Sequence, residues 1–430
     1  MPNATRTVLS TLVAACACLF QTACGGDNGG GDEPVFITVA GPNTVSIWDE
    51  VAAATINQPA GATGTAEEQR PIYATDLATV HVAMYDAVIA IAGTHRPFAV
   101  TPTASTDGAS QDAAAGEAAY QVLRGLFPAR TAVYQSAHDS LLASLPDGSA
   151  KTLGLAVGAE VAAKVLALRA GDGRSIVLTT YVPGTLPGQF RGLNPINRYL
   201  PSVKPFALTS NAQFRAPGPP ALTSAAYASD VEETRALGAV SSSTRTAAQT
   251  EIARFHTEPP FALWPRNLRR FATTGSSLAE QARLMAMLWV THSDATNACF
   301  ESKYQFQFWR PLSAITLADS DGNAATAPDT TWAAVVPTPN HPEYPAAHGC
   351  VAGALAETLR QYYGTTKLNF EFDSTVTGSK HAFASIDAMV DEVQLARIAG
   401  GMHFRTSTLD GVALGRNVAQ WALARNFQPR

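Results

Sequence analysis

Residues 342–363 read PEYPAAHGCVAGALAETLRQYY, a proline-rich turn followed by apolar residues at three- and four-residue spacing. This spacing predicts an amphipathic helix. Pro345 suits the first helical position, which would leave the backbone N–H groups of Ala346, Ala347 and His348 as unpaired donors. Such a helix start can bind an anion. His348 could exchange protons with that anion, although a single histidine at a helix start is more often structural.

The same helical spacing recurs through most of the chain, and few segments are convincing strands. High alanine and leucine content favours close packing of helices. We therefore predict an all-α fold with a helical bundle core. The clearest helical segments are residues 44–56, 76–91, 115–127, 154–170, 277–293 and 351–363.

Residues 181–221 are rich in proline and glycine and carry no sustained period. A connection of this length is uncommon in a compact domain unless it has a role. It is expected either to form the wall of a binding site or to wrap the helical core. Because no internal repeat interrupts the pattern, we predict one helical domain over residues 35–430.

Two cations, Lys303 and Arg310, enclose the aromatic sequence YQFQFW, and Pro311 follows them. Seven residues are about two helical turns, so both cations are expected on one face of a helix. Pro311 favours an extended Arg310 at the helix end. The alternative is a solvated basic face at a helix C-terminus, but the intervening aromatic residues favour burial.

The segment from Arg397 to His403 contains the glycine pair 400–401, which predicts a tight break between two helices. Both side chains could then point into one cavity. Ser407 is expected to cap the second helix, with Asp410 completing a capping-box-like start. Asp410 has two interpretations of equal weight, namely this cap and a partner that orients His403.

Together, Lys303, Arg310 and Arg397 could balance a highly charged tetrahedral oxyanion, and His348 and His403 could supply covalent and proton-transfer chemistry. The formal net charge is −5 over 430 residues. This balance gives no reason to expect nucleic acid or an anionic membrane surface as a partner. Any bound anion would have to be held by a local cluster of this kind.

The first 24 residues contain Arg6, an apolar run at 8–20 and Cys24. The run is too short to span a bilayer and is typical of an export signal. We expect an export signal at 1–24 and a flexible glycine-rich tether at 25–34. The signal resembles that of bacterial lipoproteins, in which Cys24 would be lipidated and would anchor the chain to the outer membrane. Simple secretion or release into the periplasm is the alternative.

Export means an oxidising compartment, so Cys299 and Cys350 are candidates for a disulfide. Two buried free thiols are the alternative. Cys299 lies close in sequence to Lys303, and Cys350 lies close to His348. A disulfide would therefore fasten together the two helices that hold the anion.

The chain resembles the vanadium-dependent haloperoxidases and the type 2 phosphatidic acid phosphatases, which share an active-site pattern. The pattern is Lys, six residues and Arg-Pro; then Pro-Ser-Gly-His; then Arg, five residues and His, usually with Asp four residues later. The first and third parts match at residues 303–311 and 397–403, and residues 345–348 match in part. The similarity continues at 80–91, 205–215 and 308–315, and is to the bacterial haloperoxidase-like branch, which is helical and soluble.

This resemblance implies that His403 is the axial ligand of a vanadate ion, or the nucleophile that forms a phosphohistidine with a phosphate ester. It implies that His348 is the acid/base residue. Lys303, Arg310 and Arg397 would bind the equatorial oxygens, a role that the charge argument reaches independently.

Three positions depart from the family pattern. Ala346 replaces the serine and removes a hydroxyl donor to the oxyanion, a loss that costs about 3 kcal/mol in other enzymes. Ala347 replaces the glycine, and the backbone donors remain. Ser407 stands where an aspartate usually follows His403, which removes a group that would orient this histidine.

We expect an exported vanadate-dependent haloperoxidase that oxidises bromide or iodide with hydrogen peroxide and leaves the oxidation state of vanadate unchanged. In the family, His at the position of His341 tends to accompany bromide or iodide oxidation, and Phe there tends to accompany chloride oxidation. One alternative is a periplasmic acid phosphatase that hydrolyses small phosphate esters through His403, with phosphate in the site. Another is a non-catalytic phosphate-binding lipoprotein, against which the retained cations and histidines argue.

Overall fold

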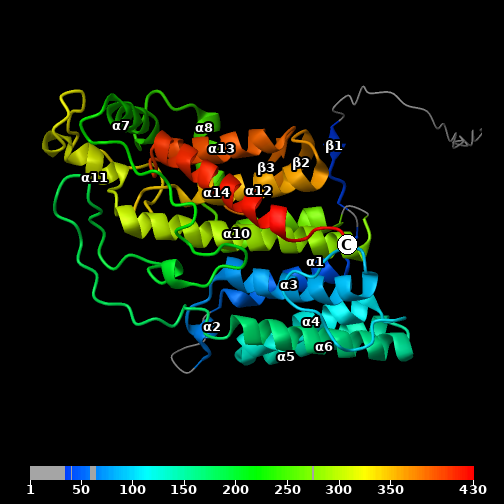
Figure 1. The fold of residues 1–430 in the computed structure, drawn as a ribbon. Coiled ribbons are helices and arrows are strands. Elements are labelled where there is room, and N and C mark those ends of the chain that lie inside the picture. Colours follow the sequence, from blue (N-terminus) through cyan, green and yellow to red (C-terminus); the bar gives the residue numbers. More distant parts are fainter. Residues whose placement is uncertain (1–33, 40, 59–63, 274–275) are drawn as a thin grey trace, which may run out of the picture. The chain divides into compact units, whose positions relative to one another are not determined.

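Fourteen α-helices and a small three-stranded sheet make up the described part of the chain (Figure 1). The computed structural model describes residues 34–39, 41–58, 64–273 and 276–430, and residues 34–430 form one compact unit. The predicted export signal, Cys24 and residues 25–33 of the tether lie outside the described residues. The predicted all-α fold is confirmed, and the small sheet is an addition that the sequence pattern does not reveal.

The helices begin and end as follows: α1 Thr44–Ile56, α2 Ala66–Gln69, α3 Tyr73–Ala92, α4 Gln111–Leu126, α5 Thr131–Ser144, α6 Ser149–Arg169, α7 Ala225–Gly238, α8 Ala247–Phe255, α9 Pro260–Leu268, α10 Leu278–Phe306, α11 Pro311–Thr316, α12 Ala347–Tyr363, α13 Ile386–Ala399 and α14 Arg405–Arg425. Short 3-10 helices are η1 Pro128–Arg130, η2 Leu200–Ser202, η3 Arg269–Thr273 and η4 Ala318–Ser320. The strands are β1 Val35–Phe36, β2 Leu368–Asp373 and β3 Lys380–Phe383.

The 29-residue helix α10 connects the two halves of the helical core. It packs against α3 on one side and against α12 and α14 on the other, as Figure 1 shows. Its first turn is capped because the Ser277 side chain accepts a hydrogen bond from the Glu280 backbone N–H. Among the described helices, α3 has the length and composition of a membrane span, but most of it is buried inside the protein. It is therefore a core helix of this fold.

Glycines allow α12 and α14 to pack with their backbones in close contact. Gly349 and Gly353 on α12 face Gly411 and Gly415 on α14, each with less than 3 Å between an added Cβ and a carbonyl oxygen of the other helix. At Gly415 that distance to the Cys350 carbonyl oxygen would be 1.9 Å. This close crossing brings the start of α12 next to the start of α14, where His348 and His403 lie.

The proline- and glycine-rich connection at 181–221 both lines a cavity and wraps the core. Its only helix in the described residues is η2. Asp294 of α10 binds the connection through its carboxylate, which accepts backbone hydrogen bonds from Phe206, Ala207 and Leu208 at 2.7, 2.7 and 3.1 Å. Ile196 and Tyr199 line the cavity described below. The two predicted roles are thus both present.

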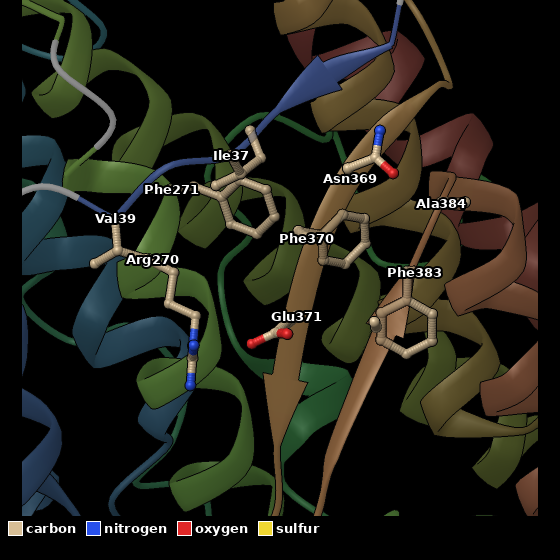
Figure 2. A pocket seen from close by; sticks show the side chains of 10 residues that line it. Ile37, Val39, Arg270, Phe271, Asn369, Phe370, Glu371, Phe383 and Ala384 are labelled. Carbon is tan, nitrogen blue, oxygen red and sulfur yellow. The ribbon is translucent and has the colours of Figure 1, made fainter.

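The small sheet has the order β1-β2-β3, with β1 parallel and β3 antiparallel to β2. A groove of about 450 Å³ lies beside the sheet (Figure 2). Ile37 and Val39, which follow β1, and Arg270 of η3 also line it. Phe370 and Phe383 of the sheet and Phe271 of η3 supply its aromatic wall. This groove shares no lining residue with the larger cavity at the histidines.

Candidate active site

Lys303 and Arg310 both hold the turn before α12. The ammonium of Lys303 donates to the carbonyl oxygens of Pro342 and Glu343, each at 2.9 Å, and Nε of Arg310 donates to that of His341 at 2.8 Å. Both cations are buried. The expectation of one shared helix face is wrong because α10 ends at Phe306, four residues before Arg310. Arg310 has the predicted extended backbone, with φ −81° and ψ 158°.

Arg310 also reaches the turn between α13 and α14. Its Nη1 donates to the Met402 carbonyl oxygen at 2.8 Å and lies 3.0 Å from Nε2 of His403. A guanidinium can only donate, so Nε2 of His403 accepts and the ring proton resides on Nδ1. Nη2 of Arg310 lies 3.0 Å from Nδ1 of His341. One guanidinium thus links the two histidine-bearing turns.

Glu343 orients His403 from the opposite side of the ring. Its Oε1 accepts from Nδ1 of His403 at 2.8 Å and from the backbone N–H of Phe404 at 3.0 Å. Glu343 is fully buried. The sequence gives no reason to select this residue, because a glutamate between two prolines has no periodic or spacing signal. The only indication in the sequence is indirect. Because the aspartate that usually follows His403 in the family pattern is missing, another residue has to orient this histidine.

Ser407 and Asp410 do not have the predicted roles. Helix α14 begins at Arg405 with Phe404 at the cap position, so Ser407 lies inside the first turn. Asp410 accepts a hydrogen bond from the Tyr344 hydroxyl at 2.5 Å. It therefore neither completes a capping box nor orients His403. Asp410 instead fastens α14 to the turn that contains Glu343.

The start of α12 also differs from the prediction. The helix begins at Ala347, and Pro345 precedes the cap residue Ala346. The Ala346 N–H is not an open donor, because it donates to the Ser407 carbonyl oxygen at 3.0 Å. Ala347 and His348 occupy the first turn, where backbone N–H groups have no helical acceptor. Two of the three predicted backbone donors therefore remain at this helix start.

Arg397 enters the site from the end of α13, across the predicted glycine break. Its Nη1 donates to the carbonyl oxygen of His256 at 3.2 Å, and its Nη2 lies 2.8 Å from Sδ of Met402. Nε of Arg397 has no hydrogen-bond partner among the described residues. Helix α13 ends at Ala399, and Gly401 has φ +75°, a conformation that glycine adopts without strain.

A chain of titratable side chains holds His256 in place beside Arg397. Nε2 of His256 lies 3.1 Å from Oε1 of Glu392, and that oxygen lies 2.7 Å from Nδ1 of His381. Nε2 of His381 is 2.6 Å from Glu251. The network joins α8, β3 and α13, and it fixes the loop that carries the carbonyl group bound by Arg397.

A cavity of about 650 Å³ lies in front of these groups. Its lining includes His341, Ala347, His348, Arg397 and His403. Nε2 of His348 is enclosed and has no hydrogen-bond partner within the described part of the chain. Lys303, Arg310, Ala346 and Asp410 do not line the cavity. Arg310 instead supports the cavity from behind through His341 and His403, and Lys303 does so through the carbonyl groups of Pro342 and Glu343.

Burial and mutual repulsion weaken the charged forms of the cations. Burial, with the Arg310 charge, lowers the pKa of Arg397 to about 9, and burial lowers the pKa of Arg310 to about 10. Burial, followed by the charge of Arg310, holds the pKa of Lys303 well below its usual range. The site thus holds three buried cations and one buried carboxyl group, Glu343, and a bound oxyanion would stabilise this excess of positive charge.

His348 and His403, which line the cavity, are neutral for the same reason. Burial, then the charge of Arg397, holds the pKa of His348 well below its ordinary value. Burial, then the charges of Arg310 and Lys303, does the same to His403. A dianionic or trianionic ligand nearby would raise both pKa values.

Cys299 of α10 and Cys350 of α12 are bonded to each other in the structure, with their Cα atoms 6.3 Å apart. Both residues are fully buried. The bond lies one helical turn from Lys303 on α10 and within the first turn of α12, next to His348. It therefore joins the two helices that carry these site residues.

Comparison with known proteins gives matches in both sequence and structure. Residues 283–429 match the family model of the VCPO second helical-bundle domain. The vanadium chloroperoxidase of Curvularia inaequalis is 33% identical over 94 residues, which cover 20% of this chain. The match spans only 15% of the length of that relative.

The solved structures extend the likeness to nearly the whole chain. The crystal structure of a bacterial vanadium-dependent iodoperoxidase has a TM-score of 0.70 at 22% identity, covering 90% of this chain and 95% of that one. The holo-type structure of a bacterial vanadium-dependent chloroperoxidase has a TM-score of 0.66 at 15% identity, covering 90% and 97%. At these identities the structural likeness concerns the fold.

Proposed function

We propose that this chain is a vanadate-dependent haloperoxidase that oxidises bromide or iodide with hydrogen peroxide. The match of residues 283–429 to the VCPO domain model, the partial match to a vanadium chloroperoxidase and the likeness of the fold support this proposal. The observation that carries the proposal is the placement of Arg397, His348 and His403 at one cavity, with the cations Lys303 and Arg310 buried behind it. Their excess positive charge is suited to vanadate or phosphate.

The donor set fits an oxyanion of this kind. The unpartnered Nε of Arg397 and Nε2 of His348 lie at the cavity, together with the first-turn N–H groups of Ala347 and His348. Lys303 and Arg310 add positive charge from behind. Vanadate held here would activate hydrogen peroxide toward attack by a halide, with no change in the oxidation state of vanadium. His403 would hold the vanadate through Nε2.

The chain's own residues prepare His403 for that role. Glu343 accepts the Nδ1 proton, so Nε2 keeps its lone pair, which accepts from Arg310 in this structure and which vanadate would take instead. A carboxylate partner also increases the basicity of an imidazole. The neutral His348 can accept a proton from peroxide as it binds and return one to the leaving oxygen. Arg397 and Arg310 can stabilise negative charge that develops on oxygen in the transition state.

His341 supports the assignment to bromide or iodide over chloride. Its ring is buried, lies 5.1 Å from the Phe300 ring between centroids, and is adjacent to Arg310. Burial and the Arg310 charge hold the pKa of His341 well below its usual range. A neutral, polarisable ring beside a guanidinium is a suitable environment for a large, weakly hydrated halide. We propose the same assignment that the family resemblance suggests.

We further propose that the protein is exported and acts in the periplasm, at the outer membrane through a lipid on Cys24, or outside the cell. The apolar run at 8–20 and the glycine-rich tether support this proposal. The bonded cysteines at 299 and 350 are also of the kind found in oxidising compartments.

The test is peroxide-dependent bromination of a reporter by full-length protein loaded with orthovanadate, beside the His403→Ala variant. Vanadate-dependent turnover that disappears in the variant would support the proposal. If the protein instead hydrolyses an aryl phosphate and vanadate inhibits it, the function is that of a phosphatase with His403 as nucleophile. No turnover in either assay, with vanadate still raising the melting temperature, would identify a binding protein.

A further inference from the structure

Exposed apolar side chains gather on one stretch of the proline- and glycine-rich connection. The three most exposed large apolar side chains in the described part of the chain are Val177, Val182 and Leu193, at 94%, 80% and 71%. Leu186 and Ile196 are exposed as well. Single exposed apolar residues are ordinary, but a group of them marks a surface that binds a partner. Residues 177–198 are therefore a candidate interaction surface.

Arg198 joins the two ends of this surface. Its Nη1 donates to the carbonyl oxygen of Thr179 at 2.7 Å, and its guanidinium carbon lies 5.3 Å from the centre of the Tyr181 ring. Val177 lies two residues before Thr179, and Val182 directly follows Tyr181. Both exposed valines are therefore close to a positively charged side chain.

Arg191 has similar surroundings in the middle of the surface. Its Nη2 donates to the carbonyl oxygen of Thr185 at 2.9 Å, directly before the exposed Leu186. The exposed Leu193 lies two residues after Arg191. The surface thus combines aliphatic side chains and guanidinium groups along its whole length.

The backbone of this stretch is fixed to the residues that follow α10. The N–H of Phe190 donates to the Gln307 carbonyl oxygen at 2.7 Å, and the N–H of Trp309 donates to that of Gly188 at 2.9 Å. The side chain of Phe190 is buried and adds an apolar anchor. The exposed aliphatic side chains are therefore carried by a backbone that is already held in place, which lowers the cost of ordering it on binding.

The charge of the connection indicates which kind of partner it binds. Residues 173–229 contain five basic residues and no aspartate or glutamate, so the net charge of −5 for the whole chain hides a local positive excess. Arg174 and Arg215 pair with carboxylates elsewhere in the fold. Within the described residues, the hydrogen bonds of Arg191, Arg198 and Lys204 go only to backbone carbonyl groups. A partner of this surface therefore presents negative charge beside apolar groups.

A second copy of the chain does not meet this requirement. A twofold dimer places the same surface of each subunit against that of the other. Two positively charged segments without acidic residues would then face each other and repel. An anionic phospholipid bilayer has phosphate groups at its surface and acyl chains beneath them. It therefore matches both the arginines and the aliphatic side chains.

We propose that residues 177–198 bind the surface of an anionic phospholipid membrane. Arg191 and Arg198 contact lipid phosphate groups. Val177, Val182 and Leu193 enter the boundary between the headgroups and the acyl chains. Because these few side chains bury little apolar area, the contact is peripheral and reversible.

This contact requires neither a lipid on Cys24 nor a particular reaction at the histidines. Ile196 belongs to the exposed surface and also lines the large cavity. Membrane binding through this surface therefore places the cavity next to the bilayer. The inference adds a partner to the proposed function, and its tests do not depend on turnover.

The first test is co-sedimentation of the full chain with vesicles of phosphatidylethanolamine and phosphatidylglycerol, beside vesicles of phosphatidylcholine alone. We expect at least tenfold tighter binding to the anionic vesicles at low salt. High salt should remove most of this difference because it screens the charges. Equal binding to both kinds of vesicle, or no binding to either, would overturn the proposal.

The second test removes the two charges. Arg191→Gln with Arg198→Gln should weaken binding to the anionic vesicles by at least tenfold. The matched control is Arg254→Gln with Arg425→Gln, which removes the same charge from exposed positions on α8 and α14. The control should bind as the wild type does. Equal losses in the two double variants would show that only net charge matters and would overturn the assignment to this surface.

The third test removes the apolar contacts. Val177→Ser with Val182→Ser should weaken binding to the anionic vesicles by at least threefold, whereas Val240→Ser with Val376→Ser, at exposed positions outside the connection, should not. All variants keep the same N-terminus, so any binding by a lipid on Cys24 or by residues 8–20 is common to them. Unchanged binding of the first double variant would overturn insertion of the valines.

Light scattering after size-exclusion chromatography distinguishes the membrane from a second copy of the chain. We expect the wild type and Val177→Ser with Val182→Ser to have the same mass. Their melting temperatures should also agree, because the replaced side chains are exposed. A wild-type dimer that dissociates in this double variant would assign the surface to a second copy and would overturn the proposal.

Discussion

Oε1 of Glu343 lies 2.8 Å from Nδ1 of His403, although the two residues are 60 positions apart in the sequence. On the other side of the ring, Nη1 of Arg310 lies 3.0 Å from Nε2. The carboxylate takes the Nδ1 proton and the guanidinium faces the Nε2 lone pair, so the two neighbours select one tautomer. These two contacts orient His403, which is the role that the family pattern gives to an aspartate after the histidine.

Replacing Glu343 by Gln should lower kcat by about 10- to 100-fold, the usual effect of losing a group that orients a metal-bound histidine. The shape of the side chain is kept, but the negative charge that holds the Nδ1 proton is lost. Steady-state bromination at saturating vanadate measures the effect. Asp410→Asn is the control, since Asp410 contacts Tyr344 and not His403. Equal losses in both variants would contradict the assigned role of Glu343.

Glu343 should also make stability depend on pH. Burial raises the pKa of this carboxyl group from an ordinary 4.5 to about 7. Between these two pH values the folded state holds a proton that the unfolded state has released. The contribution of Glu343 to the free energy of unfolding is therefore fully present below pH 4.5 and is lost as the pH rises to about 7. The slope is about 1.4 kcal/mol per pH unit. Denaturant unfolding of wild type and Glu343→Gln from pH 4.5 to 8 should show this difference, and parallel curves would refute it.

Lys303→Met and Arg397→Met should both weaken vanadate binding by tenfold or more but should differ in stability. Lys303→Met leaves the carbonyl oxygens of Pro342 and Glu343 without their donor and should lower the free energy of unfolding by about 1–3 kcal/mol. Arg397→Met removes one longer backbone contact and a buried charge, so its loss should be smaller. Thermal unfolding with and without vanadate measures both effects. The reverse order of stabilities would contradict this account.

Gly415→Ala should destabilise the protein by at least about 1–3 kcal/mol, the usual cost of overpacking. The added methyl group would lie 1.9 Å from the Cys350 carbonyl oxygen, so α12 and α14 would have to separate. Because both helices carry site residues, vanadate affinity should fall as well. Gly41→Ala is the control, since an added Cβ there meets nothing within 4 Å. Unchanged denaturation of Gly415→Ala would show that the helices can separate at no cost.

Removing the disulfide should lower the free energy of unfolding by about 4 kcal/mol, the value expected from loop closure for a separation of 51 residues. Cys299→Ala with Cys350→Ala tests this by denaturant unfolding. The wild type treated with a reductant that opens the bond should unfold at the same denaturant concentration as the double variant. A double variant as stable as the oxidised wild type would contradict the prediction.

The sequence predicts the helices well because their apolar spacing and caps are local. Residues 44–56 coincide with α1, and the glycine pair 400–401 marks the end of α13. Arg397 and His403 are brought together by that break, as predicted. The composition of 181–221 likewise indicates a connection without regular structure. These features depend on neighbours within a few residues, which a sequence pattern can reveal.

What the sequence does not predict depends on contacts between distant segments. The start of α12 is set by the hydrogen bond from Ala346 to Ser407, and Ser407 lies inside α14 because that helix begins two residues earlier. Arg310 reaches the site from a turn after α10, and not from the helix face. Glu343 gains its role only because Phe404 and His403 come next to it in space. No local pattern contains this information.

The bond between Cys299 and Cys350 closes a covalent ring around one half of the candidate site. Lys303, Arg310, His341, Glu343 and His348 all lie within the ring, whereas Arg397 and His403 lie outside it. Before oxidation, the first group sits on an open segment whose ends are held only by packing. The pocket is thus assembled from a covalently closed segment, which carries Lys303 and Arg310, and a separate segment, which carries Arg397 and His403. How well the closed segment is constrained depends on the redox state of the compartment in which the chain folds.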